Sequence, residues 1–531
     1  MILAFVSAES FFNLRLAERD KLASSEVHPG GNVNFSWPID GSIVGLYLLA
    51  TMIAGIVVRK YVGKVEHFLV AGREMDLYLG IASLAATEFG IITCMYTAQL
   101  GYKSGFAGAT PGLMQAVAMF VIGMTGFCVK PLRDSGAMTI PELFEKRFGP
   151  RVRWAAGVVI VLGGLLNMGV FLRIGGEFLV LVTGFDPTYL ELTMTVLLVA
   201  VAVYTILGGM LSVLVTDFLQ FVVMSAGLLA VTLLVFKDIG WTKLVETVEQ
   251  HHGAGGFNPL LNKDMGWPYV IFQALLQAAA VLTWQTTIAR LLAAKDTKTG
   301  QQVYTRTSFF FVCRFLIPGL WGIAALATLT DGDYALLSPA MAESKSLYAM
   351  PLFLNSFVPV GLVGLLIAAM LAADMSTDSS YMLTWGSVIY NDILAPFHKG
   401  RWSEARGLLV NRCIIAIIGV FLLLYGLWYP LKGNLWDYLA VTGTIYLSSI
   451  STLLIACCYW RRANSWGAAA AIICGAIFPS GFLVLEQLPS TASFAKQIGP
   501  YYSGIAAYVV AALAMVIGSL MKPQSRVSSA E

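Results

Sequence analysis

The residues of this chain that are best suited to chemistry lie in one short polar stretch. Residues 371–380 contain two aspartates, three serines and one threonine, within an apolar segment from about residue 359 to residue 390. That segment predicts a membrane-spanning helix, in which a central aspartate costs about 2.5–3.5 kcal/mol on insertion scales. So many polar groups in one span indicate a pathway or an ion site that faces the protein interior.

Helical spacing places three positions of this stretch on one face. Ala373, Ser376 and Thr377 stand at i, i+3 and i+4. A free carbonyl at Ala373 and two hydroxyls one turn later form half of an oxygen-only cage for a hard cation. The alternative is that the hydroxyls of Ser376 and Thr377 bond back to carbonyls of their own helix, and the spacing alone does not separate the two.

The whole chain has the composition of a polytopic membrane protein. Of its 531 residues, 57% are hydrophobic and 12% are charged, whereas soluble domains carry about 25% charged residues. The net charge of +3 predicts no nucleic-acid partner. The seven cysteines lack zinc-site spacing and fall in or beside apolar segments, and the five histidines lie in predicted loops. We therefore expect no catalytic residues and no enzyme.

Thirteen segments reach the length of about 20 apolar residues that a membrane span requires. They cover residues 40–60, 78–101, 107–129, 152–183, 187–207, 213–236, 268–292, 307–329, 357–390, 407–428, 436–459, 465–486 and 500–521. The Lys and Arg clusters at their ends all fall on one side if the N-terminus is outside and the C-terminus is cytoplasmic. We expect a multi-pass protein of the plasma membrane, and specifically of a bacterial inner membrane.

Two of these segments are interrupted by polar residues near their middle. The second carries Thr87, Glu88 and Gly90, and the seventh carries the sequence TWQTT at residues 283–287. Secondary transporters place solute and coupling ion where discontinuous helices expose carbonyls near the membrane midplane, at matching positions of two inverted halves. Interruptions five spans apart are what two five-helix repeats would produce.

Several stretches of the chain together resemble the sodium:solute symporter family, which contains sodium-coupled sugar, proline, pantothenate, iodide and sialate transporters. The likeness runs from about residue 40 to residue 520. It is carried by FLVAGR at 68–73, SLAAT at 83–87 with GYKSG at 101–105, GG at 208–209 with TDFLQ at 216–220, and AADMST at 372–377 followed by Asp392.

The resemblance implies an all-α fold of five plus five inverted repeats, the leucine-transporter architecture. One extra helix would precede the core and two would follow it. The expected organisation is an extracytoplasmic leader at 1–37, an extra helix at 38–64, the ten-helix core at 65–460, two C-terminal helices at 461–521 and a cytoplasmic tail at 522–531.

The resemblance also implies where sodium, the coupling ion, would bind. The first site would use the carbonyls of Ala86, Phe89 and Ala373 with the hydroxyls of Ser376 and Thr377. Some sialate-transporter relatives have a second sodium site, whose positions match Asp217, Ser379 and Ser380 here. Asp217 has an alternative role as a structural link to the intracellular loops.

Asp374 and Asp378 depart from what we expect in this helix of the family. They lie at i and i+4 and share a face. They could add charge to an ion site, bind a cationic group or pair with a buried arginine. Because two like charges so close disfavour double ionisation, proton coupling through this pair stays open.

Candidate solute contacts are the polar and aromatic residues of the interrupted and neighbouring helices. They are Glu88, Gln115, Arg173, Gln277, Trp284 and Gln285, with Arg314 as a further candidate. An unpaired Arg173 would favour an organic anion, since arginine binds carboxylates bidentately. Alternatively, Arg173 pairs with Glu177 and Arg314 pairs with an aspartate of the neighbouring helix.

The sequence therefore predicts a sodium-coupled symporter that imports a small polar solute by alternating access. An organic anion or amino acid is the favoured solute. A sugar is an alternative, although the usual set of sugar-binding polar residues is not evident. Proton coupling through Asp374 and Asp378 is a second alternative, and a membrane sensor or enzyme is a third. The sodium ion, the solute and the bilayer are the expected partners.

Overall fold

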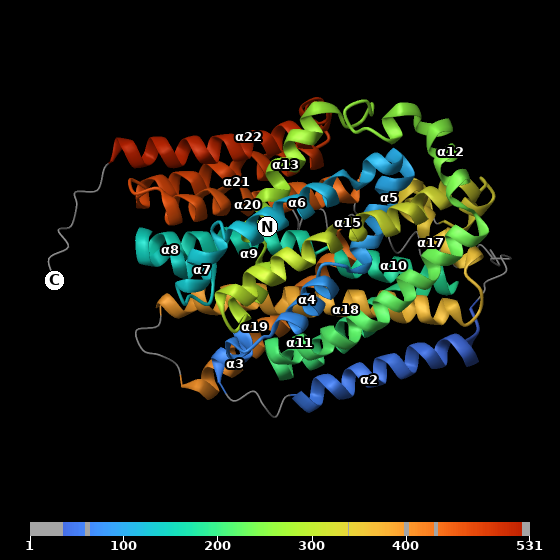
Figure 1. Cartoon of the computed structure of the whole chain (residues 1–531), viewed down its shortest axis with the longest axis horizontal. Coiled ribbons are helices and arrows are strands. Elements are labelled where there is room, and N and C mark those ends of the chain that lie inside the picture. Colours follow the sequence, from blue (N-terminus) through green and yellow to red (C-terminus); the bar gives the residue numbers. More distant parts are fainter. Residues whose placement is uncertain (1–34, 59–63, 338, 398–402, 430–433, 523–531) are drawn as a thin grey trace. The chain divides into compact units, whose positions relative to one another are not determined.

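The computed structural model describes residues 35–58, 64–337, 339–397, 403–429 and 434–522. The predicted leader at 1–37 and the predicted tail at 522–531 lie almost entirely outside the described residues. The described chain is helical (Figure 1), and its only β-type pairing is an isolated bridge between Met75 and Ala294. The prediction of an all-α fold is confirmed.

The described α-helices divide into a longer, mostly apolar group and a group of short connecting or broken helices. The first group is α2 (Ser42–Val58), α5 (Ile91–Ser104), α6 (Thr110–Thr125), α9 (Pro150–Met168), α10 (Phe171–Thr183), α11 (Leu190–Asp238), α13 (Gly266–Thr283), α15 (Thr297–Thr328), α18 (Leu362–Val388), α19 (Glu404–Trp428), α20 (Leu435–Tyr459), α21 (Ser465–Gln487) and α22 (Ala492–Met521). The second is α3 (Val65–Val70), α4 (Leu77–Thr87), α7 (Val129–Asp134), α8 (Ile140–Phe148), α12 (Trp241–His252), α14 (Gln285–Ala293), α16 (Pro339–Ala342) and α17 (Lys345–Phe357). Within the described ranges, eleven helical stretches are long and apolar enough to cross a membrane, so the predicted count of thirteen is not confirmed.

Both predicted interruptions are present as breaks between helices. The first separates α4 from α5: α4 ends at Thr87, and α5 begins after Gly90, whose backbone is extended (φ −71°, ψ 170°). In the second, Trp284 is extended (φ −66°, ψ 121°) between α13 and α14. A helix that ends inside the protein leaves its last carbonyls without helical partners, and these carry partial negative charge. The break after α4 is therefore a suitable place for a cation.

The 49-residue helix α11 folds back on itself at Gly209, which has φ 54° and ψ −150°. A Cβ placed on Gly55 of α2 would lie 2.7 Å from the Cβ of Tyr204 and 3.3 Å from Oγ of Ser212, one on each side of this turn. Residues eight apart in a straight helix are separated by about 12 Å, so a straight α11 could not bring both to Gly55. The turn sends the second arm of α11 back along α18, which brings Asp217 to Ser376.

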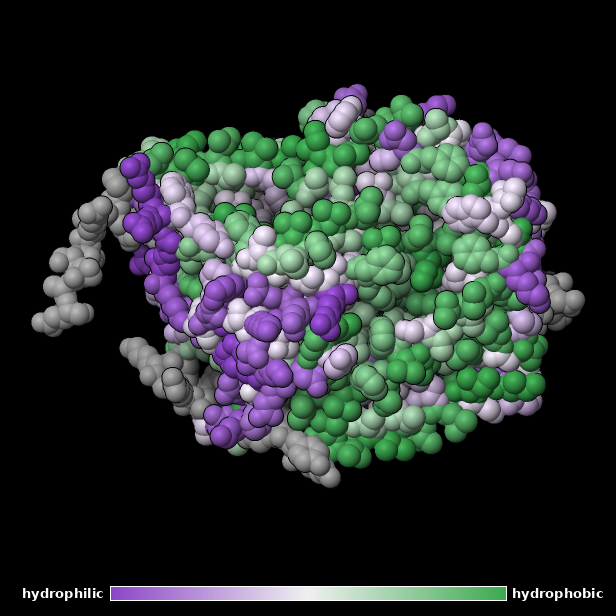
Figure 2. All heavy atoms as spheres, viewed as in Figure 1, coloured by the Kyte–Doolittle hydropathy of each residue, from purple (hydrophilic) through white to green (hydrophobic). Residues whose placement is uncertain are grey.

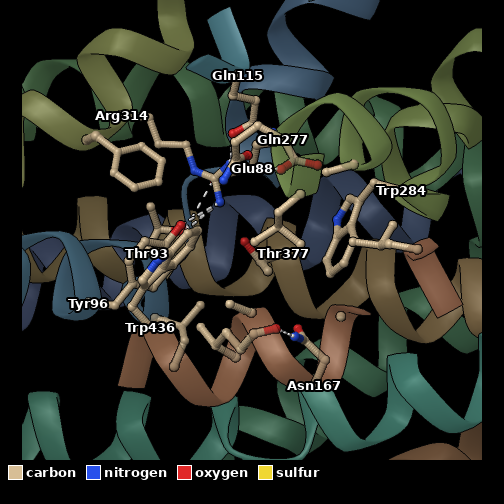
Figure 3. Close-up of a pocket in the computed structure, with 18 of the residues that line it drawn as sticks. Glu88, Thr93, Tyr96, Gln115, Asn167, Gln277, Trp284, Arg314, Thr377 and Trp436 are labelled. Carbon is tan, nitrogen blue, oxygen red and sulfur yellow. Dashed lines mark hydrogen bonds and ion pairs between the residues drawn. The ribbon is translucent and has the colours of Figure 1, made fainter. Parts of the chain in front are cut away.

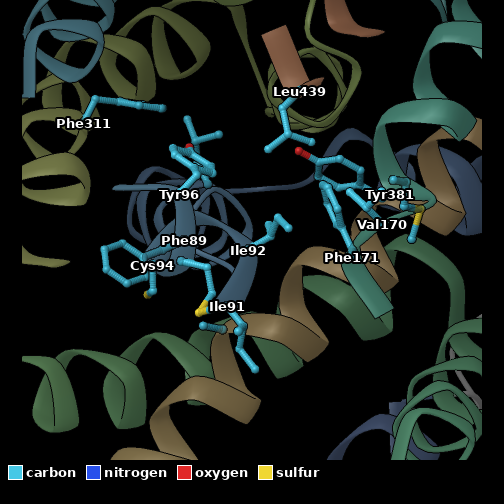
Figure 4. Close-up of a cluster of buried hydrophobic side chains, with 14 of the residues drawn as sticks. Phe89, Ile91, Ile92, Cys94, Tyr96, Val170, Phe171, Phe311, Tyr381 and Leu439 are labelled. Carbon is cyan, nitrogen blue, oxygen red and sulfur yellow. The ribbon is translucent and has the colours of Figure 1, made fainter. Parts of the chain in front are cut away.

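Helix α18 lies at the centre of the helical packing. It contacts α2, α4, α5, α9, α10, α11, α14 and α19, and its polar residues 374–380 are buried with the rest. Apolar side chains of α5, α10, α15, α18 and α20 form one buried cluster (Figure 4). Hydrophilic side chains gather at two ends of the face shown in Figure 2, one over α3, α7 and α8 and the other near α12. The broad apolar band between them is the surface expected to face lipid.

The turn at Gly209 gives a test of this packing. A Cβ at Gly209 would lie 2.5 Å from Cδ2 of Phe68 and 2.7 Å from its carbonyl oxygen, on a backbone with positive φ. We expect Gly209→Ala to reduce the free energy of unfolding by about 2–5 kcal/mol, through backbone strain and overpacking together. Thermal unfolding of the purified protein in detergent measures this.

Two controls separate the causes. Gly240 has φ 83° but open space around its Cβ position, and Gly481 has neither positive φ nor a neighbour within 4 Å. Gly240→Ala should show only the backbone strain, about 1–2 kcal/mol. Gly481→Ala, inside helix α21, should be neutral or stabilising by up to about 1 kcal/mol. If Gly209→Ala unfolds at the same temperature as Gly240→Ala, the close contact with Phe68 is not a constraint on the fold.

Candidate functional site

The break after α4 lies directly against the polar turn of α18. Oγ1 of Thr377 is 2.8 Å from the carbonyl oxygen of Thr87 and 3.0 Å from that of Ala373. Gly90 faces the same hydroxyl, because a Cβ there would come within 2.7 Å of Thr377 Oγ1. The break and the polar turn of α18 therefore meet through Thr87, whose carbonyl was not among the predicted ligands. The predicted carbonyl of Ala86 accepts the Phe89 N–H at 3.2 Å.

The residues predicted for the first sodium ion are all buried at this junction. Ala86, Phe89 and Ser376 are fully buried, and Ala373 and Thr377 are 1% and 2% exposed. The Ser376 hydroxyl donates to Oδ1 of Asp217 at 2.5 Å, whereas Thr377 is within reach of its own helix at Ala373. The alternative of back-bonding thus applies to Thr377 but not to Ser376. The set offers uncharged oxygens, which fit a hard monovalent cation that must bind and also leave.

The residues predicted for a second sodium ion have different surroundings. Asp217 Oδ2 and Ser380 Oγ both lie beside the guanidinium of Arg290, at 3.0 and 2.5 Å from Nη2. The Ser379 hydroxyl instead donates to the carbonyl of Ser376 at 3.2 Å. Arg290 lies in the second half of α14, the helix that follows the break at Trp284. It was not among the predicted site residues. A basic residue inside a predicted span was the available signal.

A small cavity of about 80 Å³ lies next to the break. Figure 3 shows Glu88, Gln115, Gln277 and Arg314 on one side of it and Asn167 on the other. Its wall combines polar side chains with aromatic rings, a composition typical of small-molecule sites. The full lining is Thr87, Glu88, Ile92, Thr93, Tyr96, Gln115, Asn167, Phe171, Leu276, Gln277, Ala280, Trp284, Arg314, Phe315, Thr377, Tyr381, Trp436, Leu439, Ala440, Gly443 and Leu447.

The two charged residues of this cavity neutralise each other. Nη1 of Arg314 is 3.1 Å from Oε2 of Glu88, and Oε1 of Glu88 accepts hydrogen bonds from Thr286 at 2.8 Å and Thr287 at 3.2 Å. Arg314 also donates to the Tyr96 hydroxyl at 2.8 Å. The expected pairing of Arg314 with an aspartate is therefore corrected to a pairing with Glu88, whose place in the break brings it across to α15.

The predicted solute contacts separate into two groups. Glu88, Gln115, Gln277 and Trp284 line the cavity, as does Arg314. Arg173 and Gln285 do not. Arg173 pairs with Glu177 one turn along α10, at 2.9 Å, and Gln285 Nε2 donates to the carbonyl of Thr283 at 3.2 Å. Arg173 is therefore not the expected contact for an anionic solute. It forms the alternative that the sequence also allowed, an ion pair with Glu177.

The aromatic and amide residues that sequence reasoning missed come partly from the polar-interrupted spans, as with Tyr96 and Tyr381, and partly from uninterrupted apolar helices. Tyr96, Asn167, Tyr381 and Trp436 belong to α5, α9, α18 and α20. Trp284 Nε1 donates to the Tyr381 hydroxyl at 3.1 Å, so that two of the rings are held together at the cavity wall. A single Asn or Trp in an apolar span carries no local signal of which neighbour it will face.

Asp374 and Asp378 have no ion pair or hydrogen bond among the described residues, and Oδ1 of Asp378 is buried without a partner. Each is 2% exposed. The expectation that they pair with a buried arginine is wrong for this structure, because Arg290, Arg314 and Arg173 each bind another acid. Gly175 of α10 faces Asp374, since a Cβ there would lie 3.2 Å from Asp374 Oδ2.

These features define a helical membrane protein with broken helices around a central cavity, the architecture of secondary transporters. A family model of the sodium:solute symporter family matches residues 68–475. The chain belongs to the sodium:solute symporter family. It is consequently a transport protein that is not an enzyme, and sodium is the coupling ion of its family.

The chain is also similar to curated relatives and to a solved structure. The chain is 26% identical to the sodium/glucose cotransporter 4 of Danio rerio over 86% of its length and 73% of the relative's. It is 25% identical to the sodium/myo-inositol cotransporter of Canis lupus familiaris, over 91% of this chain and 73% of the relative. It is 24% identical to the osmoregulated proline transporter OpuE of Bacillus subtilis (strain 168), over 90% of this chain and 94% of the relative. A Na⁺-coupled sialic acid symporter in a substrate-bound outward-open state matches the fold with a TM-score of 0.77, at 20% identity over 92% of this chain and 99% of that one.

The ion pair in the cavity gives a test of the site's construction. Glu88→Gln leaves the Arg314 charge buried without its carboxylate, and breaking a buried pair in this way costs about 3–5 kcal/mol. We expect thermal unfolding of the variant in detergent to occur at a markedly lower temperature. Gln115→Leu is the control, because it removes only a long contact of 3.5 Å with the same arginine and should cost about 1 kcal/mol or less. Equal losses in the two variants would contradict the assignment of the pair.

Proposed function

We propose that this protein is a sodium-coupled symporter in which one residue, Thr377, joins the ion site to the solute cavity. Its hydroxyl reaches the carbonyl of Thr87 at the break, and both Thr377 and Thr87 also line the cavity. A sodium ion held by the Ala373 carbonyl and the hydroxyls of Ser376 and Thr377 would draw the end of α4 against α18. The same contact positions Glu88 at the cavity wall, so that ion binding prepares the solute site.

The driving force of this arrangement is electrical as well as chemical. A cation that moves down the membrane potential contributes about 2.3 kcal/mol per 100 mV. Uncharged ligands suit a site that releases its ion to the cytoplasm on every cycle. Transport would follow from rocking of one group of helices against the rest around the fixed site.

For the solute we propose an uncharged, polyhydroxylated molecule such as a sugar or cyclitol. The charged residues of the cavity, Glu88 and Arg314, compensate each other, and Arg173 lies outside it in its own ion pair. What remains for hydrogen bonding is neutral: Thr93, Gln115 and Gln277 among others. Aromatic rings, which pack against the apolar faces of such molecules, complete the wall. The relatives named for glucose and myo-inositol transport support this choice over an organic anion.

Proton coupling is the second candidate function, because Asp374 and Asp378 are buried on one helix without a basic partner. Two carboxylates in such a position cannot both carry charge at low cost, and a shared proton relieves the repulsion. The pair lies on the same helix as the proposed sodium ligands. A proton bound there would act on the same element as sodium.

The sodium proposal predicts that Ser376→Ala with Thr377→Ala abolishes solute uptake driven by a sodium gradient in proteoliposomes. The two changes remove both hydroxyl ligands at once. Thr384→Ala is the matched control, since among the described residues this buried threonine of α18 bonds only to carbonyls of its own helix, at 2.8 Å and 3.3 Å, and uptake should persist. Undiminished sodium-driven uptake in the double variant would refute the site. Uptake driven equally by a proton gradient, and lost in Asp374→Asn with Asp378→Asn, would favour the second candidate.

The solute proposal predicts which compounds are taken up by the unmodified protein under a sodium gradient. Neutral sugars and cyclitols should be transported or should compete for transport, because a neutral cavity disfavours a net charge. Amino acids and sugar acids, tested in the same vesicles, should compete at least ten-fold more weakly. Transport restricted to amino acids or to carboxylates would show that the assignment of the solute is wrong.

A further inference from the structure

We propose that Arg290 is a built-in cation that takes the place of a second sodium ion, so that each cycle binds a single sodium. This inference rests on the proposed function. It concerns the residues Asp217 and Ser380, which the family resemblance suggests for a second ion.

Arg290 is fully buried and surrounded by oxygen atoms. Its Nη2 atom lies 2.5 Å from Ser380 Oγ, 2.6 Å from Thr87 Oγ1 and 3.0 Å from Asp217 Oδ2. Its Nε donates to Ser83 Oγ at 3.0 Å. One carboxylate and several hydroxyls converging on a single point form the kind of shell that a hard cation takes. Here that point holds the end of an arginine side chain.

The oxygen atoms of this shell have little capacity left for another cation. Oδ2 of Asp217 accepts from Ser83 at 2.5 Å as well as from Arg290, and its Oδ1 accepts from Ser376 at 2.5 Å. Asp217 and Arg290 are both fully enclosed by protein. Their charges cancel, and arginine does not lose its proton in proteins. A sodium ion added here would leave an uncompensated positive charge in a low-dielectric interior, where charge repulsion is strong.

The same network connects Arg290 to the first sodium site. Arg290 holds the Asp217 carboxylate, and that carboxylate accepts the Ser376 hydroxyl hydrogen. A hydroxyl that donates to a carboxylate presents its lone pairs in other directions, which is what a sodium ligand requires. Thr87, which Nη2 also contacts, lies at the break itself. Arg290 therefore acts as a positioning residue for the remaining ion site as well as a substitute for the absent ion.

The test is equilibrium binding of radioactive sodium to the full-length protein in detergent, which requires no knowledge of the solute. We expect one sodium ion per unmodified chain. Arg290→Ala leaves the Asp217 carboxylate and its hydroxyls without a cation, so the amount of bound sodium should double at saturation. Arg173→Ala is the control: it also removes the arginine of an ion pair with a buried acid, although Arg173 itself is 23% exposed. Among the described residues, Glu177 then keeps a hydrogen bond from the Tyr348 hydroxyl alone, and binding should stay at one.

The outcomes separate this inference from the function on which it rests. Two sodium ions bound by the unmodified chain would overturn the role of Arg290 while leaving sodium coupling intact. No bound sodium at all would overturn the proposed function, and this inference with it. If Arg290→Ala does not fold, the count for the unmodified chain still decides. A doubling in Arg173→Ala as well would show that any unpaired buried acid recruits sodium, which would contradict a specific substitution at Arg290.

Discussion

The burial of a polar helical turn at the centre of the protein is the constraint on which the rest of this structure depends. Residues 374–380 of α18 lie away from both water and lipid, and each buried hydroxyl needs a partner because an unpaired one costs free energy. Thr377 reaches the end of α4, Ser376 reaches Asp217 of α11, and Ser380 reaches Arg290 of α14. The break in α4, the turn of α11 at Gly209 and the break before α14 are the backbone features that bring these partners into range.

Charge compensation is the second principle of the interior. Arg290 with Asp217, Arg314 with Glu88 and Arg173 with Glu177 are three buried or half-buried pairs that join or stiffen helices. Each removes a charge that would otherwise be available to an ion or a solute. The cavity is consequently neutral overall despite containing an acid and a base, and the proposal of an uncharged solute rests on this neutrality more than on any single contact.

Asp374 and Asp378 are the exception to this compensation. They are buried, they lack a basic partner among the described residues, and they share a helix with the proposed sodium ligands. In an apolar interior such a pair favours states in which at least one charge is neutralised. Helix α18 thus carries hydroxyl groups that have hydrogen-bond partners on neighbouring helices, and two aspartates that have none among the described residues. Coupling to a further cation, including a proton, would act at these two aspartates.

The amino-acid sequence by itself determined the class of protein, the two helix breaks and the face of α18 that meets the first break. The membrane class and the two breaks follow from local rules: hydropathy, residue spacing along a helix and the cost of polar groups in hydrocarbon. The meeting of α18 with the first break was implied by the resemblance to the family. Most of the predicted cavity residues, namely Glu88, Gln115, Gln277 and Trp284, also line it, because they lie in or near spans with polar interruptions. The ligand assignments for sodium remain predictions that the geometry supports.

Only the tertiary structure decided which charged groups pair. Arg173 turned to Glu177 and away from the cavity, Arg314 met Glu88 rather than an aspartate, and Arg290 entered the shell predicted for a second sodium. The count of membrane spans was likewise not settled by hydropathy. The predicted segments 187–207 and 213–236, for example, both map onto the single helical stretch Leu190–Asp238. The physical reason is the same in each case. Pairing depends on the rotation and depth of helices that are distant in sequence, and local periodicity contains no information about either.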